Sequence, residues 1–509
     1  MASPCFIRQI SRKVEPTMTI GSVLAASAAI NSQKTAIALR QETISYHELD
    51  QSVTILAQWF VQQGYQRGDR IALLWPNSIE LIMLFLACFR AGLIAVPVNV
   101  RLKTNEVAYV LEHSRAVLSF VHPELASVAE QASRGCISIA RMHTIPVISD
   151  EDVDAIALPI VSDDDPALII YTSGTTSRLK GVAHSHRSLM ENVRQTYKAA
   201  PDSLQTILSM TQMAFISSMC AGLLLAVATG ATLVLMEAFD APLALDLIER
   251  FRCTYSFSLP VMIQCLIEEQ TRRPRDVSSL QTFFAGGDSV PTSTQEQFRA
   301  LFGIALREAH GMTEIGAAIV NPEKLIRPGS LGKPLEDVHA RLVGADAKDV
   351  GDGVIGELLL RSPSMFTGYW DDPAATAEAV TDGWLRTGDL CRRDSEGYYW
   401  FEGRKKEIIV RGGSNISPQE VEEAIYAHPA VLEVGVVGAP DGIYGERLIA
   451  FVSLRSGAAT LEQELKDHAG RRLADHKVPG SIVFLERLPK GPTGKIQRRA
   501  LKGSYRAAR

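Results

Sequence analysis

The sequence has 509 residues, of which 46% are hydrophobic and 21% are charged. A chain of this length is too long for a single core, so two or more domains are expected. The net charge of −5 argues against binding to nucleic acid. The seven cysteines are scattered without CxxC spacing, which favours a cytoplasmic protein over a disulfide framework or a zinc protein.

The amino-terminal segment lacks the apolar stretch that a signal peptide needs. Because Met18 begins a segment that reads like a natural start, residues 1–17 are predicted to be an extension or a misassigned start.

Short apolar runs alternate with helix-like stretches through most of the chain. Residues 78–91 predict a crossover helix, and the runs that predict strands are 70–75, 93–98, 167–171 and 231–236. This rhythm is typical of parallel α/β packing. We therefore predict an α/β fold whose large amino-terminal domain spans residues 18–403.

Residues 207–236 carry no charged side chain and are long enough to suggest a membrane span. Repeated Ser, Thr, Gly and Gln residues interrupt the stretch. We therefore predict a buried helix followed by a strand, and no integral membrane segment.

The pattern changes after about residue 320, where short strands and Gly-rich turns predict a small β-rich subdomain over 320–403. Residues 404–509 predict a small, mobile α+β carboxy-terminal domain. It contains a helix-like stretch over 417–428 and strands near 432–438 and 447–454.

Residues 171–182 directly follow the strand-like run at 167–170 and are rich in hydroxyl side chains. Hydroxyls and backbone amides can donate to phosphate, Gly174 allows a close approach, and Lys180 supplies positive charge. The segment is not a Walker A loop, because Leu179 precedes the lysine and no Ser or Thr follows it. A Ser/Thr-rich surface turn is the alternative interpretation.

Three further segments suit the other parts of a nucleotide. The Gly286–Gly287 turn could lie against a flat ring, and Asp389 could accept hydrogen bonds from ribose hydroxyls. Residues 310–314 place an aromatic ring, a hydroxyl and a carboxylate close together, which suits adenine, phosphate and Mg²⁺. Each segment alone could equally be a turn, a helix cap or a hairpin.

Taken together and in this order, the segments resemble the adenylate-forming superfamily of acyl-CoA synthetases, beetle luciferases and peptide-synthetase adenylation domains. The resemblance extends from about Ile20 to Leu501 and is greatest to an acyl-CoA synthetase. Further segments that carry it are 356–358, 368–370, 403–409, 415–422 and 492–496.

The resemblance implies an acid–thiol ligase that uses ATP to convert a carboxylic acid into an acyl-adenylate, releases pyrophosphate and transfers the acyl group to coenzyme A. It implies ATP, Mg²⁺ and coenzyme A as cofactors and co-substrates. A carboxylate and an α-phosphate repel each other, so positive charge is needed where they meet. Lys495 is implied to supply that charge, Thr313 to touch the α-phosphate, and Glu314 to hold Mg²⁺.

The same resemblance implies which residues bind ATP. The phosphate loop would hold pyrophosphate, Asp389 and Arg404 the ribose, and His310 with the Gly286–Gly287 backbone the adenine. The full implied set is Thr172, Ser173, Gly174, Thr175, Thr176, Lys180, Gly286, Gly287, His310, Gly311, Asp389 and Arg404.

The resemblance also implies that the carboxy-terminal domain rotates between the two half-reactions about Lys406. After that rotation, Gly412 and Gly413 would line the tunnel through which the pantetheine thiol arrives, where small residues leave room for a thin ligand.

The chain departs from the family pattern at two places. Ser177 and Leu179 stand where Gly and Pro are usual, which would change how the phosphate loop moves. The acyl-recognition segment lacks the usual Pro and His, and its candidate wall residues are Phe215, Ile216 and Met219. Because residues 207–236 lack charge, we predict a predominantly apolar acid without an α-ammonium group.

Several alternatives remain open at this point. The acyl group could pass to a carrier protein or an amine instead of coenzyme A, and the chain could be a nucleotide-binding regulator that has lost catalysis. The partners that the sequence predicts are a small carboxylic acid, ATP and coenzyme A, with a homodimer left open. The sequence does not separate aliphatic, alicyclic and aryl acids.

Overall fold

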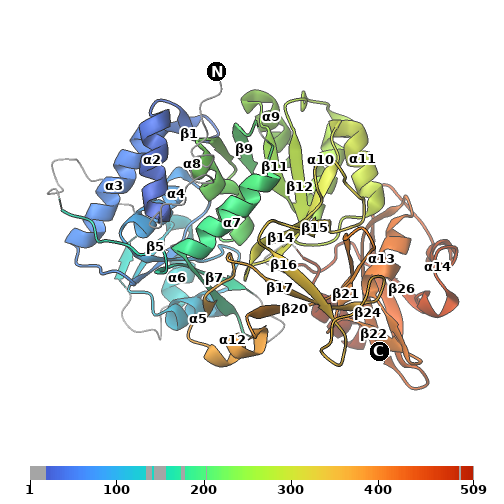
Figure 1. Cartoon of the computed structure of the whole chain (residues 1–509). Coiled ribbons are helices and arrows are strands. Elements are labelled where there is room, and N and C mark those ends of the chain that lie inside the picture. Colours follow the sequence, from blue (N-terminus) through green and yellow to red (C-terminus); the bar gives the residue numbers. More distant parts are fainter. Residues whose placement is uncertain are drawn as a thin grey trace.

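A computed structural model of the chain describes residues 19–132, 140–142, 156–172, 178–201, 203–491 and 495–507. Within these residues the strands form one nine-stranded sheet, one seven-stranded sheet and two five-stranded sheets. Figure 1 shows the two large sheets and their helices side by side, with the carboxy-terminal domain at one end of the molecule. This arrangement confirms the predicted α/β fold class.

The nine-stranded sheet carries most of the predicted nucleotide residues. Its inner strands pair in parallel, and its edges are antiparallel. In spatial order the strands are β15 (Lys333–Pro334), β14 (Gly316–Val320), β13 (Leu306–Met312), β12 (Thr282–Gly286), β11 (Tyr255–Ser258), β9 (Thr206–Ser209), β10 (Thr232–Leu235), β1 (Thr35–Leu39) and β2 (Glu42–Ser45).

The seven-stranded sheet carries the ends of the predicted phosphate loop. Its strands β7 and β8 form an antiparallel hairpin, and β8 also pairs antiparallel with β18. In spatial order the strands are β18 (Gly368–Tyr369), β8 (Lys180–Ser185), β7 (Pro166–Thr172), β4 (Ile94–Pro97), β3 (Arg70–Leu74), β5 (Leu118–Val121) and β6 (Ala140–Met142).

Helices fill the space between the two large sheets and cover their outer faces. The central layer contains α2 (Ile20–Asn31), α3 (Tyr46–Gln62), α4 (Ile79–Arg90), α7 (His186–Ala199) and α8 (Leu225–Thr229). The outer face of the nine-stranded sheet is covered by α9 (Ala241–Phe251), α10 (Pro260–Arg272) and α11 (Thr292–Phe302). On the outer face of the seven-stranded sheet lie α5 (Thr104–Ser114) and α6 (Ala126–Ala132).

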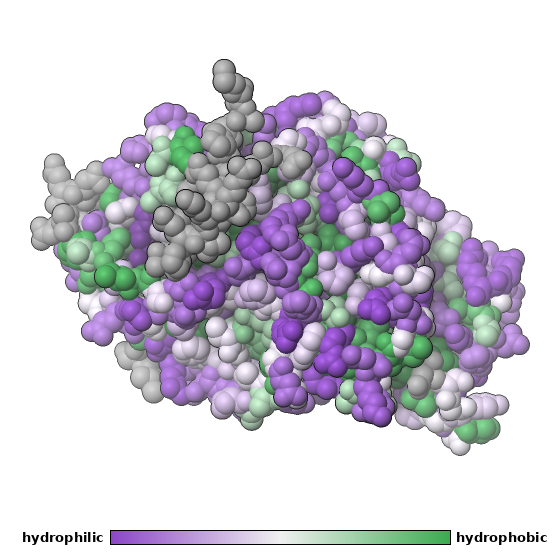
Figure 2. Space-filling model, in the orientation of Figure 1, coloured by the Kyte–Doolittle hydropathy of each residue, from purple (hydrophilic) through white to green (hydrophobic). Residues whose placement is uncertain are grey.

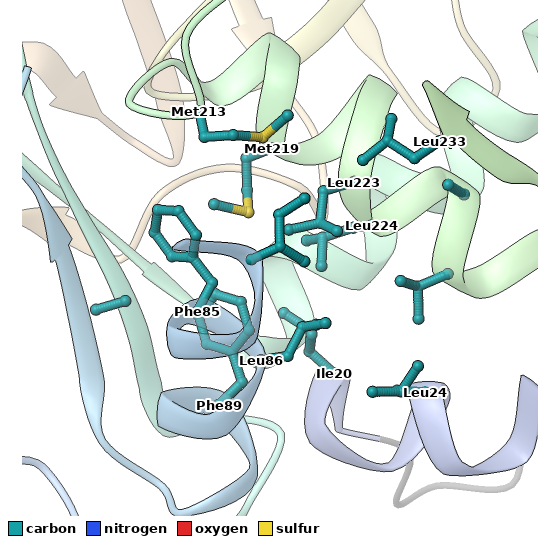
Figure 3. Packing of buried hydrophobic residues seen from close by; sticks show 14 of the residues in the cluster. Ile20, Leu24, Phe85, Leu86, Phe89, Met213, Met219, Leu223, Leu224 and Leu233 are labelled. Atoms are coloured by element: carbon teal, nitrogen blue, oxygen red, sulfur yellow. The ribbon is translucent and has the colours of Figure 1, made fainter. Parts of the chain in front are cut away.

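The strands are apolar on both faces because both faces are buried. Along β1, Ile37 and Leu39 pack into the central layer, whereas Ala38 between them packs on the opposite side. Figure 3 shows the central layer, where side chains of α2 and α4 such as Leu24, Phe85 and Phe89 meet Met219 and its neighbours. This burial explains the continuous apolar runs that predicted parallel strands.

The uncharged stretch at 207–236 forms β9, a π-helix (Ser218–Leu224), α8 and β10, all buried in the large domain. The prediction of a buried helix followed by a strand is confirmed. Among the helices of the described ranges, none is long and apolar enough to cross a membrane. On the face shown in Figure 2, hydrophilic and hydrophobic residues are intermixed.

The two five-stranded sheets follow later in the chain. The first contains β16 (His339–Val343), β17 (Gly356–Arg361), β20 (Trp384–Arg393), β19 (Val380–Thr381) and β21 (Tyr399–Arg404), with α12 (Pro373–Ala379) beside it. The second contains β23 (Ser414–Ile416), β22 (Ile409–Arg411), β25 (Gly445–Leu454), β24 (Val431–Asp441) and β26 (Ser481–Phe484). Its helices are α13 (Pro418–Tyr426), α14 (Glu462–Gly470) and α15 (Arg498–Ala507).

Candidate active site

A cavity of about 860 Å³ lies where the carboxy-terminal domain meets the large domain. Its walls come from the ends of β12 and β13, from α10 and α13, and from the loop before α15. The predicted site residues that line it are Gly287, His310, Gly311, Asp389, Arg404 and Lys495. Residues from both domains therefore meet around one space.

His310, Asp389 and Arg404 form a charged group on three strands. Asp389 on β20 lies opposite Arg404 on β21, and its Oδ1 is 3.2 Å from Arg404 Nε. Its Oδ2 is 2.8 Å from His310 Nε2 on β13. Burial opposes the charge of Asp389, but the His310 hydrogen bond and the charges of Arg404 and Lys495 hold its pKa below the usual carboxyl value.

Two buried polar atoms of this group have no hydrogen-bond partner. They are Asp389 Oδ1, which is close to Arg404 without the angle of a hydrogen bond, and His310 Nδ1. Because buried polar atoms are normally paired, such exceptions need an explanation. A ligand hydroxyl or ring nitrogen in the cavity could complete both atoms, as the sequence predicted for ribose and adenine.

The Gly286–Gly287 turn keeps its backbone open to the cavity. A Cβ on Gly286 would lie 2.6 Å from the Ala309 carbonyl oxygen, so β12 and β13 approach too closely there for any side chain. Gly287 has φ of +87°, which other residues rarely adopt. Both glycines are therefore required by local geometry, which leaves backbone beside His310 where a flat ring could lie.

Thr313 and Glu314 lie in the turn between β13 and β14, and neighbouring elements hold that turn. The Thr313 carbonyl oxygen is 2.8 Å from His184 Nε2, and burial lowers the pKa of His184 to about 4, so the imidazole is neutral. The Tyr369 hydroxyl donates to Glu314 Oε1 at 2.8 Å. Burial raises the pKa of Glu314, and the Tyr369 hydrogen bond and the Lys180 charge oppose that rise.

The strands β7 and β8 bring together both ends of the predicted phosphate loop. Thr172 and Lys180 are partners in that antiparallel ladder. Lys180 Nζ lies 4.6 Å from the centre of the Tyr369 ring. The loop residues Ser173, Gly174, Thr175, Thr176 and Ser177 lie outside the described residues.

Lys495 reaches the cavity from the carboxy-terminal domain. Lys490 and Ile496 form a β-bridge, and the Gly491 amide donates to the Lys495 carbonyl oxygen at 2.8 Å. Burial and the charge of Arg404 lower the pKa of the Lys495 ammonium, whereas Asp288 and Asp389 raise it. The ammonium therefore lies among the same charged residues that surround the predicted ribose position.

The predicted hinge and tunnel residues lie away from the cavity walls. Lys406 is exposed in the turn that follows β21. Gly412 and Gly413 form the two-residue turn between β22 and β23, with φ of +58° and +82°. Positive φ at both positions is typical of a type I′ hairpin and favours glycine. The roles of all three in rotation and thiol entry stay predictions.

The three candidate acyl-wall residues lie elsewhere than the walls of this cavity. Met219 is fully buried and Ile216 is 9% exposed, and both belong to the core of the central layer (Figure 3). Phe215 is half-buried. That these residues meet the acyl group stays a prediction.

The sequence interpretation assigned no role to Tyr369 or Glu308. Tyr369 belongs to the 368–370 segment that carried the family resemblance, which was the available signal. Glu308 lies two residues before His310 on β13 and lines the cavity. Gln295 Nε2 donates to its Oε1 at 2.6 Å, and burial raises its pKa to about 7. A carboxylate two residues before His310 along a strand shares its face, and this spacing was the signal.

Comparisons with known proteins agree with this geometry. The family model for AMP-binding enzymes matches residues 24–370, and that for the AMP-binding enzyme carboxy-terminal domain matches residues 420–495. A feruloyl-CoA synthase from Amycolatopsis sp is 33% identical over 96% of this chain and 98% of the relative. A sulfoacetate–CoA ligase from Cupriavidus necator is 33% identical over 87% of this chain and 89% of the relative.

Two further relatives extend the comparison. The fatty acid–[acyl-carrier-protein] ligase ScoC from Streptomyces coeruleorubidus is 30% identical, over 92% of this chain and 93% of the relative. The crystal structure of the anthranilate CoA ligase AuaEII with anthranoyl-AMP matches with a TM-score of 0.91 and 26% identity, over 97% of this chain and 99% of the other. The chain therefore belongs to the family of AMP-binding enzymes, whose relatives here are named acyl-CoA ligases and synthetases.

Proposed function

We propose that this protein activates a predominantly apolar carboxylic acid with ATP and transfers the acyl group to coenzyme A. The observation that carries the proposal is the cavity in which Lys495 of the carboxy-terminal domain meets the His310–Asp389–Arg404 group of the large domain. Such a meeting of domains is needed for adenylation, because the lysine and the nucleotide-binding residues belong to different units.

The charges around the cavity support an adenylation step. The attack of a carboxylate on the α-phosphate brings two anions together, and preorganised positive charge at that point lowers the barrier. The partly buried ammonium of Lys495 has a lowered pKa in the free protein. Arriving anions favour its charged form. Lys180, at the end of β7–β8, is proposed to neutralise the departing pyrophosphate.

We propose that Glu314 holds Mg²⁺ together with ATP phosphates. In the part of the chain that the structure describes, no group of three or more His, Cys, Asp or Glu side chains could hold a metal by itself. A single buried carboxylate fits Mg²⁺, which commonly binds through one or two carboxylates plus substrate phosphates. When bound, the metal would neutralise phosphate charge.

The acid is proposed to be mainly apolar and to lack an α-ammonium group. The support is that residues 207–236 carry no charged side chain, so no carboxylate there could meet an ammonium. The named substrates of the relatives range from sulfoacetate to ferulate and long-chain fatty acids. They therefore leave the acid of this protein open.

Coenzyme A is the proposed acceptor because most of the relatives described above are CoA ligases. Transfer to a carrier protein is the second candidate, and the specific observation in its favour is the similarity to ScoC. Both acceptors present a thiol on pantetheine, so the same activated intermediate serves either.

The test is acid-dependent pyrophosphate release from ATP and Mg²⁺ with a panel of aliphatic, aryl and α-amino acids. The best acid is then incubated with coenzyme A, a holo carrier protein or an amine, and the products are identified by mass spectrometry. We expect release with an apolar acid and a coenzyme A thioester. An α-amino acid as the best substrate would overturn the proposed acid class, and acylated carrier protein alone would overturn the proposed acceptor.

A further inference from the structure

Tyr369 lies between the two charged residues that the proposed adenylation step uses on phosphate and metal. Its hydroxyl donates to Glu314 Oε1 at 2.8 Å. The face of its ring lies beneath the Lys180 ammonium, with 4.6 Å between Nζ and the ring centre. One side chain therefore touches a carboxylate at its tip and an ammonium on its face.

Backbone hydrogen bonds fix Tyr369 to both of these neighbours. On β18 it lies opposite Val182 of β8, two residues after Lys180. The Trp370 amide donates to the Gly181 carbonyl oxygen at 2.7 Å, and the Phe366 amide donates to the Glu314 carbonyl oxygen at 2.7 Å. The short segment thus connects the strand that carries Lys180 with the turn that carries Glu314.

A second set of contacts fixes the direction of the phenol ring. The Tyr369 amide donates to Thr376 Oγ1 at 2.9 Å, where α12 packs against the strand. Phe366 packs edge to face on the Tyr369 ring, with 5.0 Å between ring centres. The ring is held on its apolar side, and its hydroxyl meets the carboxylate.

These contacts have different physical effects on the two charged residues. A hydrogen bond to one oxygen of the Glu314 carboxylate restricts its rotation and favours its charged form. The electron-rich face of an aromatic ring attracts an ammonium without removing its charge, so Lys180 keeps a preferred position while its charge stays available. Donors of this kind orient metal-binding carboxylates in other proteins.

We infer that Tyr369 is a positioning residue for the adenylation half-reaction: its hydroxyl orients Glu314 toward Mg²⁺, and its ring orients Lys180 toward the ATP phosphates. The inference rests on the proposed function. It makes the two contacts separable, because one substitution removes the hydroxyl alone and another removes both.

The experiment compares Tyr369→Phe with Tyr369→Leu in the full-length protein. Calorimetry measures ATP affinity in EDTA and the affinity of the protein–ATP complex for Mg²⁺. Tyr369→Phe should weaken Mg²⁺ binding by about 10- to 100-fold and leave ATP affinity in EDTA unchanged. Tyr369→Leu should weaken both, because it also removes the ring beneath Lys180.

The matched control is Tyr398→Phe, which deletes another hydroxyl with one hydrogen bond, at 2.7 Å to the Leu325 carbonyl oxygen. It should change neither affinity. Conversion of a synthetic acyl-adenylate and coenzyme A to thioester should also be the same in Tyr369→Phe as in the parent, since neither ATP nor metal takes part in that step.

Two outcomes would overturn the inference. Equal Mg²⁺ affinities in Tyr369→Phe and the parent would show that the hydroxyl does not orient Glu314, and this variant decides the point even if Tyr369→Leu fails to fold. Equal losses in both half-reactions with unchanged Mg²⁺ affinity would show a purely structural role. Failure of the proposed function is distinct, because it would appear as a parent protein that binds no ATP.

Discussion

The nucleotide end of the cavity and the predicted acyl segment are built in different ways. His310, Asp389 and Arg404 come from three strands, and charged contacts of 2.8 and 3.2 Å join them. Ile216 and Met219 come from one segment and pack among apolar side chains in the central layer. The first region has buried polar atoms without partners, whereas the second is close-packed core.

This contrast separates two kinds of cost. A substitution among charged residues at a cavity removes an interaction with the ligand, so it should lower a rate or an affinity with little change in stability. A substitution in the packed segment leaves a void, so it should lower stability first. Each prediction below uses a variant that would show the opposite cost if this distinction were wrong.

The largest effect is expected for Lys495. Lys495→Ala should reduce acid-dependent pyrophosphate release by on the order of 10²-fold or more, because it removes charge at the point where carboxylate and α-phosphate meet. It should convert a synthetic acyl-adenylate and coenzyme A to thioester at nearly the parent rate. Gly412→Leu should show the reverse, forming adenylate without discharging it. Both half-reaction rates are measured separately for each variant.

The control for Lys495→Ala is Lys466→Ala, which removes a lysine of the same domain that pairs with Glu462 on α14. It should leave both half-reactions unchanged. If Lys495→Ala slows both half-reactions equally, the lysine is structural and the separation of the two steps is wrong.

Met219 should show the cost of a packed position. Met219→Ala should lower the free energy of unfolding by about 2–5 kcal/mol, because the fully buried side chain leaves a cavity. The volume-conserving variant Met219→Leu should cost less than about 1.5 kcal/mol. Phe215→Ala, at a half-buried position, should change the preference between two acids. Denaturant unfolding and competition between acids are the measurements.

A different result would move Met219 to the substrate wall. If both Met219 variants alter the preference among acids while the free energy of unfolding stays at the parent value, then Met219 meets the acyl group and the core assignment fails.

Glu308 predicts a pH-dependent stability at the cavity. Its folded-state pKa is raised from 4.5 to about 7 by burial, so the stability it contributes is fully present below pH 4.5 and is lost as pH rises through 7. That rise is worth on the order of 3 kcal/mol. Glu308→Gln keeps an acceptor for Gln295 and should be more stable than the parent at pH 8, but not at pH 5.

Thermal unfolding midpoints between pH 5 and 8.5 measure this effect. Glu486→Gln is the control, since Glu486 also lines the cavity but is exposed. A constant difference between Glu308→Gln and the parent over this range would contradict the assignment.

The smallest effect is expected in the phosphate loop. Ser177→Gly or Leu179→Pro should lower the KM for ATP by roughly two- to fivefold, the scale of backbone-entropy effects. Gly permits positive φ and Pro pre-sets φ, so both should help the loop to close on pyrophosphate. Steady-state kinetics with ATP varied at saturating acid measure this. The same KM in both variants would mean that the departures from the family pattern are neutral.

The sequence by itself determined many elements and the family. Residues 70–75, 93–98 and 167–171 predicted strands, and β3, β4 and β7 occupy these places. The predicted helices at 78–91 and 417–428 correspond to α4 and α13. These predictions succeed because the spacing of apolar residues along the chain directly reflects which face of a helix or strand is buried.

The tertiary structure decided which of the predicted residues meet. His310 and Asp389 are 79 residues apart and belong to different sheets. Lys495 meets Asp389 through the placement of a separate domain, and Tyr369 reaches Glu314 through the pairing of β18 with β8. An apolar pattern indicates that Met219 is inside without indicating which interior it enters. Contacts of this kind depend on how sheets and domains pack, and periodicity along the chain carries no information about that packing.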